Sequence, residues 1–165
     1  MAEYIYRQKD AQVGNIRWGH FSTIGRSGCG AVAAYNAAVA LGKNPKFLQL
    51  VREMEEKHMP SLGGIFGMNV FRLKFWLQKK FGRADLYLFG TDEWERQTRL
   101  CRAVVIFYKN KGIFKGNHFI TGVRTGECFV FYNAGTLPKD TVIPMDEAVA
   151  RLKKAGHTPM FLIIL

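Results

Sequence analysis

The chain has 165 residues and a mass of 18.8 kDa, the size of one domain, and 48% hydrophobic residues suffice for an ordinary core. It contains no long block of like charges, no internal repeat and no apolar stretch of membrane-spanning length, which argues against disorder, a solenoid and a transmembrane protein. A net charge of +11 could attract nucleic acid, but Lys and Arg are dispersed, so we expect a solvated basic surface and no nucleic-acid partner. We expect a single domain over residues 1–165.

The cysteine content indicates a reducing compartment. Cys29, Cys101 and Cys128 form an odd and sparse set, which does not fit a disulfide framework. The first fifteen residues carry charges where a signal peptide needs an apolar run. We therefore expect a cytoplasmic protein, although an export signal that had already been removed would leave no trace.

Helices are predicted in the first half of the chain. Residues 30–41 are apolar or small on every side, which predicts a helix that is buried all round. A second helix is predicted to be capped by Asn44 and to begin at Pro45, with one apolar stripe. A third is predicted over residues 70–81, between a cap at Asn69 and a stop at Gly82.

The second half of the chain reads mainly as strands. Short β-branched and aromatic runs occur at residues 85–89, 103–108, 118–123, 128–132 and 160–165, with a hairpin turn at 124–127. A short helix is predicted to start at Thr91, and another to cover residues 145–154. Helices followed by a mostly antiparallel sheet predict an α+β fold with the buried helix packed between the two halves.

Cys29 is the candidate nucleophile. It opens the buried helix, where unpaired backbone N–H groups and the positive end of the helix dipole favour the thiolate. Gly28 and Gly30 on either side would let a substrate approach closely and leave the Cys29 N–H free to stabilise an oxyanion. A small buried cysteine at a tight turn would have the same sequence.

His118 and Asn133 are its candidate partners. His118 begins a predicted strand, and Asn133 ends the next one fifteen residues later, so a hairpin would return both to the same level. An Asn side-chain carbonyl can accept a hydrogen bond from an imidazole and orient it. Taken separately, His118 could be a surface histidine and Asn133 an ordinary turn residue.

These residues resemble a known family. The stretch SGCGAVAAYNA resembles the nucleophile region of papain-like cysteine peptidases, and most closely the compact bacterial branch that contains double-glycine leader peptidases. HFITGVRTGECFVFYNAG, from His118 to Gly135, is similar to the His-strand-turn-strand layout of that branch, with Asn133 where the branch usually has Asp. The resemblance implies a papain-like fold and a Cys29, His118, Asn133 triad.

The second oxyanion donor departs from the family pattern. The family usually has a Gln six residues before the nucleophile, and this chain has Thr23 there. Ser27, Thr23, Ser22 or His20 could supply a donor from the same loop. A member without activity would also have this sequence.

The function expected from these residues is that of a hydrolase that cleaves an amide bond of a peptide through a Cys29 thioester. An ester substrate, transfer to an amine as in a transglutaminase, and a papain-shaped binding module without catalysis stay open. The pattern contains no pair of Cys or His residues at metal-ligand spacing and no phosphate-binding loop, so we expect neither a metal nor a cofactor. The glycine-rich loop at residues 61–68 is expected either to line the cleft or to be a plain connector.

Overall fold

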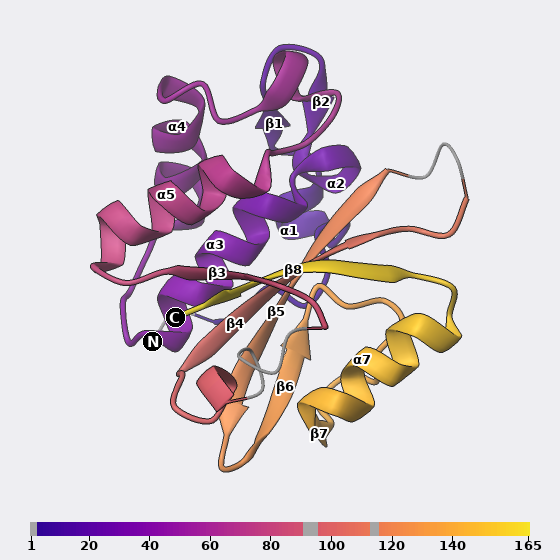
Figure 1. Ribbon diagram of the computed structural model, residues 1–165. Coiled ribbons are helices and arrows are strands. Elements are labelled where there is room, and N and C mark those ends of the chain that lie inside the picture. The colour runs from indigo at the N-terminus through magenta and orange to yellow at the C-terminus, as the bar shows by residue number, and fades with distance from the viewer. Residues whose placement is uncertain (1–2, 91–95, 113–115) are drawn as a thin grey trace.

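A computed structural model describes residues 3–90, 96–112 and 116–165, and it has an α+β fold. Six antiparallel strands form one sheet in the order β3-β8-β4-β5-β6-β7, and β1 and β2 form a separate pair (Figure 1). The helices are α1 (Ala11–Gly14), α2 (Ile24–Ser27), α3 (Cys29–Ala40), α4 (Phe47–Glu56), the 3-10 helix η1 (Ser61–Gly64), α5 (Val70–Phe81) and α7 (Met145–Lys154). The strands are β1 (Arg17–Trp18), β2 (Ser22–Thr23), β3 (Asp85–Leu88), β4 (Ala103–Lys109), β5 (Asn117–Thr125), β6 (Cys128–Tyr132), β7 (Val142–Ile143) and β8 (Thr158–Ile164). Among the described helices, none combines the length and the apolar character that crossing a membrane requires.

Strand β4 shows why the sheet lies between two layers of helices. Its side chains alternate between the faces, and residues 103–108 are all buried. Val105 and Phe107 join the core under α3, α4 and α5, while Val104 and Ile106 join the core under α7. The helices of the first half therefore cover one face and α7 covers the other (Figure 1).

Helix α3 lies at the centre of the first layer. Its residues from 29 to 38 are all buried, as the apolar sequence on every side predicted. It packs along β5, where the Thr121 hydroxyl donates to the Ala33 carbonyl at 3.2 Å. This buried bond sets the position of α3 along the strand and so decides where its first residue, Cys29, lies.

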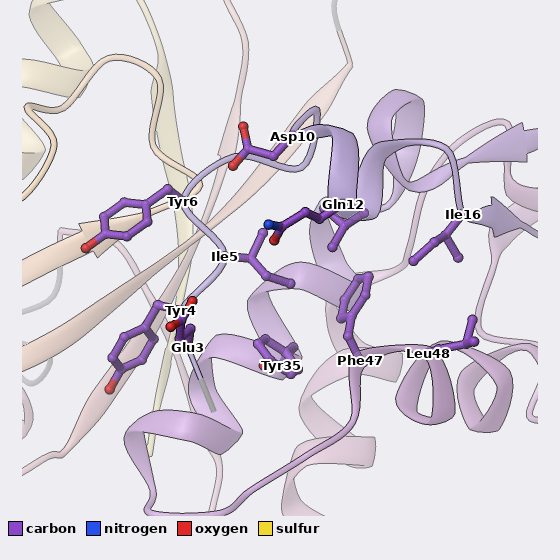
Figure 2. Close-up of a pocket in the computed structure, with 11 residues that line it drawn as sticks. Glu3, Tyr4, Ile5, Tyr6, Asp10, Gln12, Ile16, Tyr35, Phe47 and Leu48 are labelled. Carbon is purple, nitrogen blue, oxygen red and sulfur yellow. The ribbon is translucent and has the colours of Figure 1, made fainter. Parts of the chain in front are cut away.

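The N-terminal segment is anchored to α3 by a buried amide. Asn36 donates to the Ile5 carbonyl and accepts from the Ile5 N–H, both at 2.9 Å. Ile5, Tyr35 and Phe47 gather around a cavity of about 880 Å³ beside this segment (Figure 2). The anchor brings the first residues of the chain across the molecule towards the sheet.

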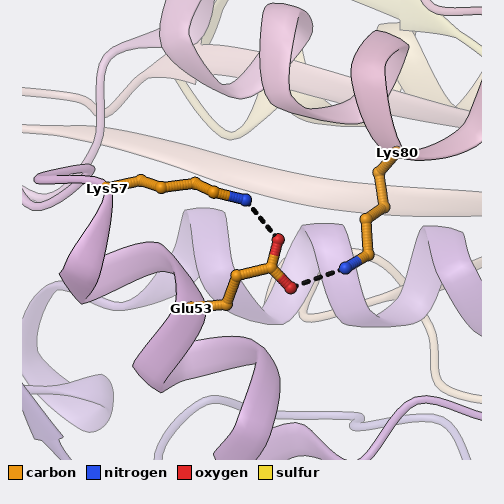
Figure 3. Close-up of polar contacts among 3 residues, drawn as sticks. All are labelled: Glu53, Lys57 and Lys80. Atoms are coloured by element: carbon orange, nitrogen blue, oxygen red, sulfur yellow. Dashed lines mark hydrogen bonds and ion pairs between the residues drawn. The ribbon is translucent and has the colours of Figure 1, made fainter.

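Helices α4 and α5 are held together by packing and by a shared carboxylate. Glu53 on α4 binds Lys57 one turn later at 2.5 Å and Lys80 on α5 at 2.6 Å (Figure 3). Burial would raise the pKa of Glu53, but the two ammonium groups lower it. The group is partly exposed, so it contributes little stability beyond fixing the pairing of the helices.

Three element boundaries show what the sequence could predict. Helix α5 has the bounds predicted for it: Asn69 accepts from the Phe71 and Arg72 backbone N–H groups, and Gly82 ends the helix in the left-handed region. The helix predicted at residues 145–154 also has those bounds. The start predicted at Asn44 and Pro45 is wrong, because α4 begins at Phe47.

The late start of α4 follows from tertiary packing. Lys46 is extended and makes no side-chain cap, and the Phe47 ring packs edge-on against Tyr35 of α3 at 5.3 Å. Elements of two to four residues, such as α1, β1, β2 and α2, were too short to leave a periodic signal. The helix predicted to start at Thr91 lies outside the described residues.

Gly64 should be far less replaceable than Gly82, although both have positive φ angles of 98° and 86°. A Cβ at Gly64 would lie 2.1 Å from the Trp18 carbonyl oxygen, whereas a Cβ at Gly82 would meet nothing within 4 Å. We expect Gly82→Ala to cost about 1–2 kcal/mol of unfolding free energy from backbone strain alone. Gly64→Ala should cost at least about 2 kcal/mol more, measured by urea denaturation. Equal losses would contradict the close approach of η1 to β1.

Candidate active site

A cleft of about 570 Å³ opens where the start of α3 meets β4 and β5. Cys29 lies at its base with 6% of its surface exposed, and His118 at the start of β5 faces it. Besides Cys29 and His118, the described residues that line the cleft include polar and apolar side chains, among them Gln8, Arg26, Ser27, Ile65, Phe66, Met68 and Phe107. The structure therefore brings Cys29 and His118 together from elements 89 positions apart in the chain.

The environment of Cys29 favours its thiolate. Burial by itself would raise the pKa of the thiol, but a hydrogen-bonding interaction with the His118 ring and the positive charge of that ring lower it below the ordinary value. Backbone N–H groups of Phe119 and Gly30 also bond the sulfur and lower the pKa further. The expectation that the start of a buried helix stabilises a thiolate thus has a specific physical basis.

The same interaction favours the protonated form of His118. Burial would lower the pKa of the imidazole, but the hydrogen-bonding interaction with Cys29 and the charge of the sulfur raise it above the usual histidine value. A lowered thiol pKa and a raised imidazole pKa shift the proton in the same sense, from the sulfur towards the ring, and so favour a thiolate–imidazolium pair over the neutral form.

Asn133 contacts His118 through its main chain. The Nε2 atom of His118 lies 2.8 Å from the Asn133 carbonyl oxygen, which can only accept a hydrogen bond. Nε2 therefore carries a hydrogen, and Nδ1 is the nitrogen that exchanges a proton with the sulfur. The carbonyl points at the ring because Asn133 has a φ of 59°, a conformation that Asn tolerates better than most residues.

The Asn133 side chain does not orient the imidazole directly, which corrects the role predicted for it. Its Oδ1 accepts from the Gln8 N–H at 2.9 Å, and its Nδ2 donates to the Gln8 Oε1 and to the Phe119 carbonyl, both at 3.2 Å. The buried amide thus ties β6, β5 and the N-terminal segment together. It positions its own carbonyl by fixing the backbone around it.

Gln8 is the site residue that sequence reasoning missed. Its Nε2 donates to the Ile24 and Gly25 carbonyls at 3.2 and 3.1 Å, while its other atoms bond Asn133. It therefore links the loop before the nucleophile to the segment that holds His118. No local pattern marks such a residue, because its partners lie 16 to 125 positions away.

The serine and threonine predicted as oxyanion donors have other positions or partners. Ser27 lines the cleft, but its hydroxyl donates to the Gly64 carbonyl and shares a 2.6 Å hydrogen bond with Ser22. Its single hydrogen is engaged in holding η1 to the nucleophile loop. Thr23 ends β2 before α2 and does not contribute to the described lining of the cleft.

Gly28 and Gly30 allow neighbouring residues to pack closely on both sides of Cys29. A Cβ at Gly28 would lie 2.5 Å from the Ile24 Cδ1 atom, and one at Gly30 would lie 3.0 Å from the Met68 Cβ atom. Both glycines are buried, and neither contributes to the described lining. They let α2 and the residues after η1 approach the nucleophile, and their role in admitting substrate stays a prediction.

The glycine-rich loop lines the cleft. Ile65, Phe66 and Met68 form one wall, opposite Phe107 of β4. Ile65 and Phe66 are 58% and 73% exposed, so apolar side chains face solvent at the rim. Of the two roles expected for this loop, the structure selects the one beside the nucleophile.

The described residues contain no group of three or more His, Cys, Asp or Glu side chains that could hold a metal ion. The larger cavity beside Ile5 is lined by aromatic groups and by the carboxylates of Glu3 and Asp10, without a thiol or an imidazole among its described lining residues (Figure 2). Nucleophilic chemistry is thus supported in the cleft at Cys29 and not in the cavity beside Ile5.

Alkylation should report the state of Cys29. At pH 6 we expect iodoacetamide to modify Cys29 at least about tenfold faster than N-acetylcysteine, because a lowered pKa keeps the thiolate present as the pH falls. His118→Ala should remove most of this advantage, since the two largest contributions that lower the thiol pKa come from the imidazole, and the Phe119 and Gly30 N–H groups alone must then oppose the effect of burial. Cys101 is the internal control, because burial raises its pKa to about 11. Peptide mass spectrometry reads each site, and equal rates at Cys29 and the free thiol would refute the ion pair.

Replacing Asn133 by Gly tests whether its main-chain carbonyl or its side-chain amide orients the His118 ring. Asn133→Gly keeps the carbonyl and tolerates the positive φ, but it removes the bonds to Gln8 and Phe119. We expect a loss of about 2 kcal/mol in unfolding free energy and a shift in the pH profile of Cys29 alkylation that is clearly smaller than that of His118→Ala, because the carbonyl stays but its backbone is held less firmly. A shift as large as that of His118→Ala would mean that the side-chain amide orients the ring after all.

Comparison of the sequence with models of known protein families and with curated proteins gives no match. The case for function therefore depends on the geometry of the site. Three features carry it: a buried thiol at the start of α3, an imidazole interacting with it, and a carbonyl that holds the far side of the imidazole.

Proposed function

We propose that this protein is a papain-like cysteine hydrolase that cleaves amide bonds of peptides through a thioester on Cys29. The observation that carries the proposal is geometric: the Cys29 thiol and the His118 ring meet in one cleft, and the Asn133 carbonyl holds the far nitrogen of the ring. The pKa shifts agree with it, down for the thiol and up for the imidazole. A structural cysteine in an apolar core has a raised pKa, as Cys101 does. A nucleophile needs the opposite shift.

In the proposed reaction, the Cys29 thiolate attacks the substrate carbonyl carbon and the carbonyl oxygen becomes an oxyanion. The backbone N–H of Cys29, at the positive end of α3, stabilises that charge. Protonated His118 then donates its Nδ1 proton to the leaving nitrogen as the carbon–nitrogen bond breaks, which leaves a thioester and a neutral imidazole. His118 next removes a proton from water, and the resulting hydroxyl attacks the thioester carbonyl carbon. The carbon–sulfur bond then breaks, which releases the carboxylic acid product and restores the Cys29 thiolate beside protonated His118.

The papain-like assignment is supported by the order of the elements. The nucleophile begins a buried helix in the first half of the chain, and the base begins a strand in the second half. The partner of the base follows the next strand, β6. These positions are similar to those of the family that the sequence resembles.

Hydrolysis is preferred over transfer to an amine because of charge. Arg26 lines the cleft, and none of its described lining residues is an Asp or Glu that would attract a protonated amine. Water is neutral, so the positive charge of the cleft does not repel it. A binding module without catalysis would have no use for a thiol whose pKa is lowered, which makes it the weaker alternative.

A library of internally quenched peptides tests the proposal. Cys29→Ala should abolish cleavage, and His118→Ala should reduce kcat/KM by about 100-fold or more, because both nucleophile activation and leaving-group protonation are lost. Cys128→Ser is the matched control, since this half-buried thiol on β6 does not line the cleft, and it should leave cleavage unchanged. An activated ester should also give a burst and an acyl-protein whose mass label maps to Cys29.

Two outcomes would refute the proposal. One is cleavage that persists in Cys29→Ala. The other is a wild-type protein that neither cleaves the library nor accepts an acyl group from the ester, even though Cys29 is alkylated rapidly.

A further inference from the structure

A second cavity of about 540 Å³ adjoins the cleft on the far side of His118. The two share Gln8, Arg26, Asn110 and His118 in their linings, whereas Cys29 lines only the cleft. In the proposed reaction His118 protonates the leaving nitrogen within the cleft. Because the two cavities share part of their linings, the rest of the leaving group can extend past the imidazole into the second cavity.

The charges of this cavity are all of one sign. Arg7, Lys9 and Arg26 line it, and its described lining contains no Asp or Glu. Within the described part of the chain, none of these three side chains makes a hydrogen bond or an ion pair. By contrast, Lys80 and Arg151 elsewhere on the surface are paired with carboxylates. The cations of the cavity are available to a ligand.

The backbone that carries two of these cations is held in place. Gln8 lies between Arg7 and Lys9, and its N–H bonds the Asn133 Oδ1 at 2.9 Å. The Asn133 N–H in turn donates to the Tyr6 carbonyl at 2.8 Å. These two hydrogen bonds fix the backbone of residues 6–8 against the end of β6. Binding of a ligand would therefore not have to order this backbone and would avoid that entropic cost.

His157 adds a polar ring to the cavity wall. Its ring lies 4.9 Å from that of Tyr108, and its Nδ1 is buried without a partner in the described structure. Burial and the nearby charge of His118 lower the pKa of His157, which favours its neutral form. A neutral imidazole can still donate a hydrogen bond to an anion.

We propose that this cavity is a subsite for a carboxylate on the leaving group of the substrate, an inference that rests on the proposed function. Arginine binds carboxylates with paired N–H donors, and two arginines line the cavity. The carboxylate is either the side chain of an acidic residue after the scissile bond or the free C-terminus of a short leaving peptide. Both sources offer the same group to the same cations.

Protection of Cys29 from iodoacetamide tests the subsite without requiring turnover. The probes are Ala-Glu-amide, Ala-Ala with a free C-terminus, and neutral Ala-Gln-amide. We expect at least one carboxylate probe to protect Cys29 at about tenfold lower concentration than the neutral probe. Better protection by Ala-Glu-amide indicates an internal acidic residue, and better protection by Ala-Ala indicates a C-terminal carboxylate.

Matched variants separate a local subsite from overall charge. Arg7→Gln with Arg26→Gln should abolish the difference between carboxylate and neutral probes. Arg52→Gln on the exposed face of α4 should leave the difference intact. Equal protection by all probes in the wild type, or equal loss in the Arg52 variant, would overturn the subsite.

Cleavage of the peptide library distinguishes failure of the subsite from failure of the proposed function. Cleavage that is indifferent to Glu or Gln after the scissile bond would overturn the subsite and leave the hydrolase standing. Absence of cleavage combined with charge-selective protection would refute hydrolysis and support an anion site beside a reactive thiol.

Discussion

Helix α3 is buried on every side, and its first residue meets the start of β5 where little water reaches. The Thr121 hydroxyl bonds the Ala33 carbonyl and sets how far α3 lies along the strand. In this position the helix dipole, the Gly30 and Phe119 backbone N–H groups and the His118 ring all act on one sulfur atom. The depth of burial would suppress ionisation if any of these partners were missing, so packing and electrostatics depend on each other.

The imidazole is held by backbone rather than by an amide side chain. A main-chain carbonyl is an acceptor whatever residue carries it, so the hydrogen bond to His118 depends on the conformation of the chain and not on side-chain chemistry at that position. The conformation in turn depends on the amide of Asn133, which Gln8 and Phe119 hold. Loss of this network would therefore affect the site through the backbone.

The two sides of the cleft around Cys29 differ in polarity. Ile65, Phe66 and Phe107 provide an apolar wall on one side, and cations follow on the other side, beyond His118. The overall charge of +11 would give any anion a weak attraction to the surface. The cavity beyond His118 gathers Arg7, Lys9 and Arg26 and so adds a local attraction for an anion. In the proposed function, this one charge distribution would bear on both the substrate and the acceptor.

The sequence predicted the elements whose signals are local. The apolar character of residues 30–41 indicated a buried helix, and Asn69 and Gly82 bounded α5 because capping depends on neighbours a few residues away. The α+β class followed from helices preceding strands. The start of α4 was mispredicted: the helix begins at Phe47, whose ring packs against Tyr35 of α3, and the sequence does not reveal this long-range contact.

For the site, the sequence by itself determined which chemistry was available and roughly where: a thiol at the start of a buried helix, and an imidazole and an amide at the two ends of a hairpin. Only the tertiary structure decided which atoms meet. It turned the Asn133 carbonyl towards His118, engaged Ser27 with Gly64, and brought Gln8 to Asn133 across 125 positions. Helix and strand patterns arise from neighbours along the chain, whereas these contacts arise from how whole elements pack, which no local pattern encodes.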